Sequence, residues 1–247
     1  MASKRKNSRI KLAHVYAPVV SQSTVAYFAL ENMIVMGELK PATWLSELSL
    51  SQGMGIGRTP VREALKELER DNLVEIVPSR GVRVKELHTY EQLQMLEVRR
   101  PLEKMVDRRA AELGNDAQRK QLLALSEQTM EFVEEENQTQ AMLSNRECCR
   151  MIWTMCGNAS LVRAITPLFS STRRFVIFYG QFPQHAEIAR LHHAQAIAVS
   201  QGVRRDVDRA SDNMMDYLES FARSILSTQI NDLRDPFSLG KSENRVL

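Results

Sequence analysis

The 247-residue sequence has few cysteines and no long apolar segment. Its three cysteines, Cys148, Cys149 and Cys156, are odd in number and two are adjacent, so they do not form the framework of a disulfide-stabilised secreted domain. No apolar run approaches the roughly 18 residues needed to cross a bilayer. No apolar signal core follows the basic residues near Met1. We therefore expect a cytoplasmic protein with no export signal and no membrane partner.

An excess of basic over acidic residues is also lacking outside one part of the chain. Residues 1–87 carry 13 Lys and Arg against 9 Asp and Glu, whereas residues 88–247 carry 20 against 21. An excess of cationic side chains in one segment is the expected footprint of phosphate contact, although this excess is modest and would not establish DNA binding alone. The length suits two modest domains or one large one.

Residues 44–70 have the pattern of two short helices joined by a glycine-bearing turn. Three leucines give the first helix one apolar side and three glycines end it: Leu45, Leu48 and Leu50, then Gly53, Gly55 and Gly57. A second helix opens at Thr59, where Pro60 suits the first turn. Its apolar residues recur at the spacing of one buried stripe: Val61, Leu65 and Leu68. Such a pair forms a helix-turn-helix, whose second helix enters the DNA major groove with its N-terminus first.

Two arginines stand at the start of that second helix. Arg58 precedes it, and Arg62 lies one turn further on, away from the apolar stripe. A bidentate guanidinium is the usual reader of guanine, while Thr59 and the free amides of a first helical turn suit a phosphate oxygen. For any single residue, an ordinary helix pair with surface arginines is the alternative reading.

Two strand-like runs follow, at residues 74–77 and 82–84. They flank the segment 78–81, which contains Arg80 and Gly81 and predicts a hairpin with a basic tip. A hairpin in this position has the shape of a wing that reaches the neighbouring DNA backbone or minor groove.

Residues 22–87 resemble the winged-helix domain of GntR-family bacterial transcription regulators. The resemblance is carried by Arg58 to Leu65, then by Leu68, Leu73-Val74, Arg80-Gly81-Val82 and Val84. One departure is Gly57, where the family usually has serine. The resemblance implies that five residues meet double-stranded operator DNA: Arg58, Thr59, Arg62, Arg80 and Gly81.

The remaining sequence predicts helices almost throughout. We expect a flexible basic arm at 1–20, a winged helix-turn-helix domain at 21–87 whose first helix covers 23–36, an all-helical domain at 88–234 and a C-terminal tail at 235–247. A capping box at Thr89–Gln92 would open a helix ending at Gly114. Further helices are expected at 116–136, 139–156, 159–181, 185–201 and 206–231. The predicted fold class is mainly α, a winged helix-turn-helix with a small β-hairpin joined to an all-α bundle.

The helical half resembles, with less specific motifs, the effector-binding FCD domain of the FadR-type branch of this family. The resemblance is carried by residues 97–103, by 157–161, and by the spaced Ala210, Met214 and Leu218. It implies a domain that usually binds a small carboxylate, often beside a divalent metal held by one aspartate and three histidines.

The metal-ligand positions have changed here. Asn145 and Cys149 occupy the first two, His192 (or His193, if the register slips by one) the third, and Tyr217 the fourth. Loss of a carboxylate and two imidazoles removes most of the binding free energy of such a site. We therefore expect no metal cofactor.

A pocket without a metal is still expected, formed by Arg99, Asn145, Cys149, His192 and Tyr217. Arg173 and Arg174 could together bind a carboxylate. The alternative is that each forms a surface or interhelix ion pair. Together these features predict a homodimeric transcription regulator that binds a near-palindromic operator. An organic-acid effector would control it. Repression is the commoner outcome in the family, so we expect a repressor.

Two other classes of protein are alternatives to this transcription regulator. An enzyme with a DNA-binding appendage is not expected, because the helical half has no nucleophile elbow, phosphate loop or intact metal triad. The other alternative is a DNA-binding protein whose helical domain only dimerises and senses no ligand. A ligand that stabilises the protein and changes its operator affinity would exclude it.

Overall fold

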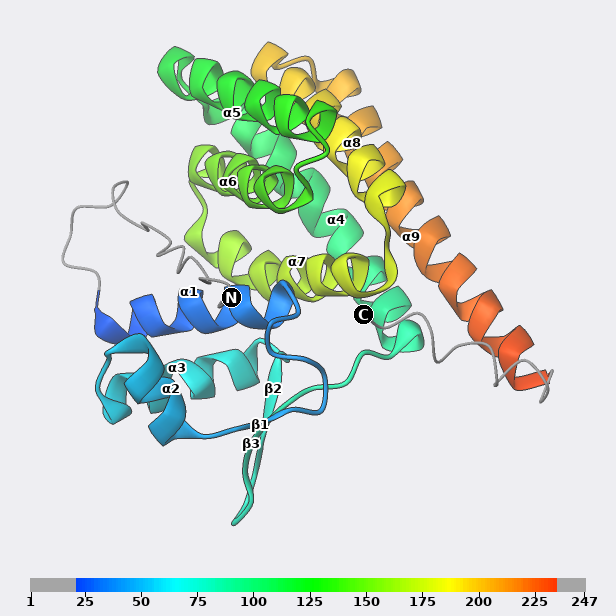
Figure 1. Ribbon diagram of the computed structural model, residues 1–247. Coiled ribbons are helices and arrows are strands. Elements are labelled where there is room, and N and C mark those ends of the chain that lie inside the picture. The colour runs from blue at the N-terminus through cyan, green and yellow to red at the C-terminus, as the bar shows by residue number, and fades with distance from the viewer. Residues whose placement is uncertain (1–20, 235–247) are drawn as a thin grey trace, which may run out of the picture.

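A small sheet and three helices precede six longer helices in the computed structural model, which describes residues 21–234 (Figure 1). The expected basic arm at 1–20 and tail at 235–247 lie outside the described residues. The mainly α fold class, with a winged helix-turn-helix followed by a helical bundle, is confirmed.

The N-terminal part packs three helices and a small sheet around one hydrophobic core. Its elements are α1 (Gln22–Val35), β1 (Trp44–Leu45), α2 (Glu47–Met54), α3 (Arg58–Arg70), β2 (Val74–Val77) and β3 (Gly81–Val84). The strands are antiparallel in the order β1-β3-β2. Leu30 and Ile34 of α1 and Leu65 and Leu68 of α3 are among the fully buried side chains of this core.

The beginning of the helix-turn-helix differs from the prediction. Leu45 does not lie on the first helix but pairs with Val82 in the sheet. The helix begins after Ser46, whose hydroxyl accepts a hydrogen bond from the Ser49 amide as an N-cap. Gly53 lies inside this helix, which ends at Gly55 in the left-handed conformation (φ 66°). A two-residue strand was not foreseen because its partner lies 37 positions along the chain.

The C-terminal part is a helical bundle, and its helices begin and end close to the predicted residues. Its elements are α4 (Thr89–Leu113), α5 (Asp116–Glu134), α6 (Gln138–Cys156), α7 (Ala159–Tyr179), α8 (Phe182–Gln201) and α9 (Arg204–Arg234). The long α4 packs along α9 and also contacts α6, α7 and α8. α4 is therefore surrounded on several sides, which buries polar as well as apolar residues along it.

Two local predictions in the bundle were wrong. The Thr89 hydroxyl does not cap α4; it donates to the Gln229 side chain of α9, because both residues lie in a buried contact. Pro183 lies in the first turn of α8 rather than in a break, since a proline there leaves no helical hydrogen bond unmade.

The two parts of the chain touch through α1 and α7, which lie side by side (Figure 1). Residues 85–88 link β3 to α4 without regular structure, as expected. The neighbouring Arg174 of α7 donates a hydrogen bond to the Lys85 carbonyl of this linker. Of the possible Arg173-Arg174 clamp, Arg174 thus holds the linker.

Candidate nucleic-acid interface and ligand cavity

The N-terminal turn of α3 is exposed and basic. Val61, Leu65 and Leu68 are buried, so they fix the opposite face of the helix in the core. Arg58 and Thr59 are exposed at its first turn. The N-cap is Gly57, which has no side chain to accept from the first amides. These amides and the helix dipole are therefore available to an anion such as a backbone phosphate.

Arg62 is held in place by Glu47 of α2. Its Nε lies 3.1 Å from both carboxylate oxygens, and its Nη2 lies 2.8 Å from Oε2. The Arg62 side chain is still 58% exposed. The hydrogen bond from Arg62 lowers the pKa of the Glu47 carboxyl, and the positive charges of Arg62, Arg58 and Lys66 lower it further. Lys66 was missed in the sequence, although its position four residues after Arg62 places it on the same helical face.

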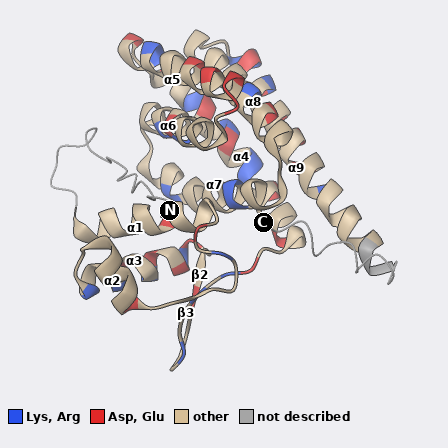
Figure 2. Cartoon of the chain, viewed as in Figure 1, with Lys and Arg blue, Asp and Glu red and all other residues tan. Residues whose placement is uncertain are grey.

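The hairpin of β2 and β3 projects away from the helices, and Figure 2 shows basic residues near its tip. Arg80 and Gly81 are both exposed. The turn depends on two left-handed residues, Ser79 (φ 62°) and Gly81 (φ 110°). Arg80 is thus presented at the end of a two-stranded arm, as a DNA-contacting wing requires.

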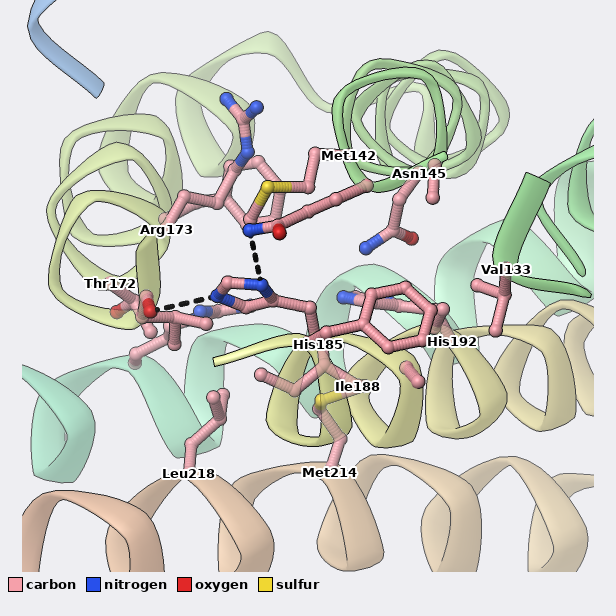
Figure 3. A pocket seen from close by; sticks show the side chains of 18 residues that line it. Val133, Met142, Asn145, Thr172, Arg173, His185, Ile188, His192, Met214 and Leu218 are labelled. Atoms are coloured by element: carbon pink, nitrogen blue, oxygen red, sulfur yellow. Dashed lines mark hydrogen bonds between the residues drawn. The ribbon is translucent and has the colours of Figure 1, made fainter. Parts of the chain in front are cut away.

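A cavity of about 50 Å³ lies within the helical bundle (Figure 3). It is lined by side chains from α4 through α9, and most of the lining is apolar. Seven polar residues line it: Arg99, Gln138, Asn145, Thr172, Arg173, His185 and His192. The volume corresponds to about three to five water-sized positions. Without expansion, it suits only a small molecule.

Two arginines that line this cavity, Arg99 and Arg173, lie against one aromatic ring. The guanidinium carbons of Arg99 and Arg173 lie 5.1 and 5.7 Å from the centre of the Phe169 ring. Arg99 is 1% exposed and its Nε donates to Glu103 at 2.9 Å, but its Nη2 is buried without a hydrogen-bond partner. Both terminal nitrogens of Arg173 are also buried without one, and burial lowers the pKa of this residue to about 10. Both arginines that line the cavity therefore carry buried donors that lack a hydrogen-bond acceptor.

The histidine at the cavity wall is neutral. Burial lowers the pKa of His192 to about 4, and its Nδ1 is 2.9 Å from the Gln195 side-chain oxygen. Gln195 donates in turn to Asp107 at 2.6 Å, and Asp107 accepts from Ser211 at 2.5 Å. Burial and the nearby Glu103 raise the pKa of Asp107 to about 7. These groups form a buried polar network behind the cavity.

A second histidine, His185, joins three helices at the cavity edge. Its Nε2 is 3.1 Å from the Val176 carbonyl, and its Nδ1 is 2.6 Å from the Gln138 amide nitrogen (Figure 3). A carbonyl can only accept, so Nε2 carries the proton and Nδ1 accepts from Gln138. Neither Gln138 nor His185 was foreseen, because each is an isolated polar residue in the sequence.

The comparisons with known proteins agree with this arrangement. A model described as bacterial regulatory proteins of the gntR family matches residues 22–84, and an FCD domain model matches residues 94–220. The chain belongs to the GntR family. It is a DNA-binding transcription regulator of the FCD type, and the family is one of regulators rather than enzymes.

Individual relatives of this GntR-family chain are more distant. It is 31% identical over 108 residues to the regulator YdhC of Bacillus subtilis, a match that covers 44% of this chain and 46% of YdhC. It is 27% identical over 199 residues to the transcriptional repressor GlaR of Escherichia coli, covering 78% of this chain and 90% of GlaR. The chain thus spans less than half of YdhC but most of GlaR.

Solved structures support the fold. The McbR/YncC structure from E. coli superposes with a TM-score of 0.73 at 20% identity, covering 84% of this chain and 99% of that one. A GntR regulator from Rhodococcus sp. RHA1 gives a TM-score of 0.64 at 21% identity, with coverage of 84% and 99%. Across residues 21–234, no helix combines the length and apolar character that a bilayer crossing requires.

The structure brings together part of the effector site expected from the family. Arg99, Asn145 and His192 line the cavity, while Cys149 lies behind it with its Sγ 3.8 Å from His192 Nδ1. Tyr217 does not line the cavity; Met214 and Leu218 of α9 do so instead. His192 rather than His193 therefore lies at the cavity, since the Nδ1 of His193 is 3.0 Å from the hydroxyl oxygen of Ser126 on α5.

These residues do not fit the divalent metal that FCD domains often hold. Burial raises the pKa of the Cys149 thiol well above its ordinary value, and the Asn145 side-chain oxygen carries no charge. The positive charges of two arginines that line the cavity, Arg99 and Arg173, would repel a cation. Within residues 21–234, no group of three or more His, Cys, Asp or Glu side chains is placed to hold a metal ion.

Proposed function

We propose that the chain is a homodimeric repressor whose operator binding is controlled by a small monocarboxylate in the bundle cavity. The observation that carries this proposal is the set of buried guanidinium nitrogens without acceptors on Arg99 and Arg173. A carboxylate supplies acceptor oxygens and negative charge, whereas a neutral ligand supplies only the former. The other lining residues are mainly apolar and suit a short hydrocarbon body.

The DNA-binding role uses the exposed turn of α3 and the wing. Arg58 and Arg62, which are exposed on the first two turns of α3, would read base edges in the major groove. Thr59, Arg80 and Gly81 are also exposed and would contact the backbone. A homodimer would place two such surfaces on the half-sites of a near-palindromic operator. Repression is supported by the relatives GlaR and RspR of E. coli, both named as transcriptional repressors.

Ligand binding can be tested by thermal unfolding in the presence of acetate, propionate and lactate at matched ionic strength. We expect at least one to raise the Tm of the wild type and to have no such effect on Arg99→Met. Arg163→Met is the matched control, because Arg163 is an exposed arginine of the same domain outside this cavity. The carboxylate site is rejected if all three anions leave the wild-type Tm unchanged, or if they raise the Tm of Arg99→Met as much as that of the wild type. Failure of every anion would favour the alternative in which the helical domain only dimerises.

A further inference from the structure

A carboxylate of the DNA-binding domain is buried in the contact with the helical bundle. Glu31 of α1 is 2% exposed, although a charged side chain is rarely buried without partners. Its partners all belong to the bundle. Ser170 donates to Oε1 at 2.9 Å, Arg146 forms an ion pair with Oε2, and Arg173 Nη1 lies 3.8 Å from Oε1. Glu31 therefore joins α1 to both α6 and α7.

Arg146 and Arg173 differ in the hydrogen bonds that their guanidinium groups donate. Arg146 donates a hydrogen bond to Glu31. Arg173 lies within ion-pair distance of Glu31 but donates no hydrogen bond from either terminal nitrogen. It also lines the ligand cavity. The Arg173 side chain thus reaches from the wall of the proposed effector cavity to the carboxylate of the DNA-binding domain.

We infer that Arg173 is a counter-ion shared by Glu31 and the effector, and that a carboxylate in the cavity weakens the docking of α1 on α7. This inference rests on the proposed carboxylate site. Two negative charges near one guanidinium repel each other, and an effector that hydrogen-bonds Arg173 satisfies donors that otherwise only attract Glu31. Because linkage is reciprocal, the docked Glu31 must weaken effector binding by the same factor.

The next residue along α7 extends the effect to the linker. Arg174 donates to the Lys85 carbonyl between β3 and α4. Consequently, one turn of α7 holds both the buried carboxylate of α1 and the segment that connects the two domains. A displacement of this turn would change both contacts and hence the orientation of the winged domain.

The first test measures propionate binding by calorimetry in the wild type, Glu31→Gln and Glu67→Gln. Glu67 is the matched control, since it is an exposed carboxylate of the same domain and, like Glu31, lines a cleft between α1, α3, α6 and α7. We expect Glu31→Gln to bind propionate about fivefold more tightly than the wild type, the lower end of usual allosteric coupling. Glu67→Gln should bind like the wild type. Equal affinity in all three proteins would overturn the shared counter-ion.

The second test needs no ligand and therefore separates this inference from the proposed function. Trypsin cleavage after Lys85 reports how firmly the domains are docked. Glu31→Gln and Arg173→Gln should each increase the cleavage rate several-fold, and the double variant should cleave no faster than Glu31→Gln alone. Arg173→Lys, which keeps the charge, should restore part of the protection. Wild-type cleavage of Arg173→Gln, or multiplied effects in the double variant, would refute the link whether or not propionate binds.

Discussion

Arg62 of α3 and Glu47 of α2 form a two-point ion pair across the turn of the helix-turn-helix. The pair orients the guanidinium before DNA arrives, while its high exposure leaves it accessible. Preorganisation of this kind reduces the side-chain entropy lost on binding. The recognition helix is therefore both fixed in the core and aimed at solvent.

Replacement of Arg58 or Arg62 by alanine should weaken operator binding by about 1–3 kcal/mol each and relax base specificity. The reason is the loss of a base-edge contact from the first two turns of α3. Fluorescence anisotropy with a duplex selected from a random pool by the wild type would measure it. Arg205→Ala removes an exposed arginine from the helical domain and serves as the control. Unchanged affinity and specificity in both recognition-helix variants would show that another surface reads the DNA.

The wing makes a different prediction, because we propose that Arg80 contacts the DNA backbone rather than base edges. Arg80→Ala should weaken binding to selected and random duplexes by similar factors. The slope of log affinity against log salt concentration should fall by about one. A loss confined to the selected duplex would instead indicate that Arg80 reads a base.

Two buried groups give opposite pH dependences of stability. Between about pH 4 and 6.5, His192 is protonated in the unfolded chain but not in the native state, where its pKa is about 4. This group therefore makes the free energy of unfolding rise with pH. Native Asp107, with a pKa of about 7, keeps a proton that the unfolded chain releases from about pH 4 upward, so stability falls as pH rises. In the wild type the two contributions oppose each other.

Single variants should separate them. Asp107→Asn leaves the His192 contribution, so the free energy of unfolding should rise from pH 4 to 6.5 more steeply than in the wild type, by up to about 1.4 kcal/mol per pH unit. His192→Gln leaves the Asp107 contribution and should shift the slope in the opposite direction. Urea unfolding at several pH values measures both slopes. Shifts of the same sign in the two variants would contradict the assignment.

Core packing in the winged domain predicts a large cost for Leu65→Ala. Leu65 is 1% exposed, and truncation of a buried leucine costs about 2–5 kcal/mol. Leu113→Ala, at a leucine that is 56% exposed, should change the free energy of unfolding by no more than about 0.5 kcal/mol. Similar losses at the two positions in denaturant unfolding would mean that the burial of α3 is described incorrectly.

Local periodicity explains which parts of the fold were predictable. The stripe of Val61, Leu65 and Leu68 repeats with the helical period, and the wing strands are short apolar runs around a turn. Such signals do not depend on distant residues. Arg99, Glu103 and Asp107 show the limit, since their four-residue spacing resembles a solvated salt-bridge face. They are buried because other helices surround α4.

The cavity was predicted less completely because it depends on helix rotation. On α9, Met214 and Leu218 line it, and Tyr217 is excluded, since one residue turns a helix by about 100°. The burial of Glu31 had no local signal at all. Its partners Arg146, Ser170 and Arg173 lie more than 100 residues away and meet it only in the packed structure.

The central claim, that the bundle cavity controls operator binding, is tested most directly by one titration. The affinity of the wild type for its selected duplex should be measured with and without saturating propionate, at constant ionic strength, beside the cavity variant Arg99→Met. We predict that propionate weakens wild-type binding about fivefold or more and leaves Arg99→Met unchanged. Identical wild-type affinity with and without bound propionate would contradict the account.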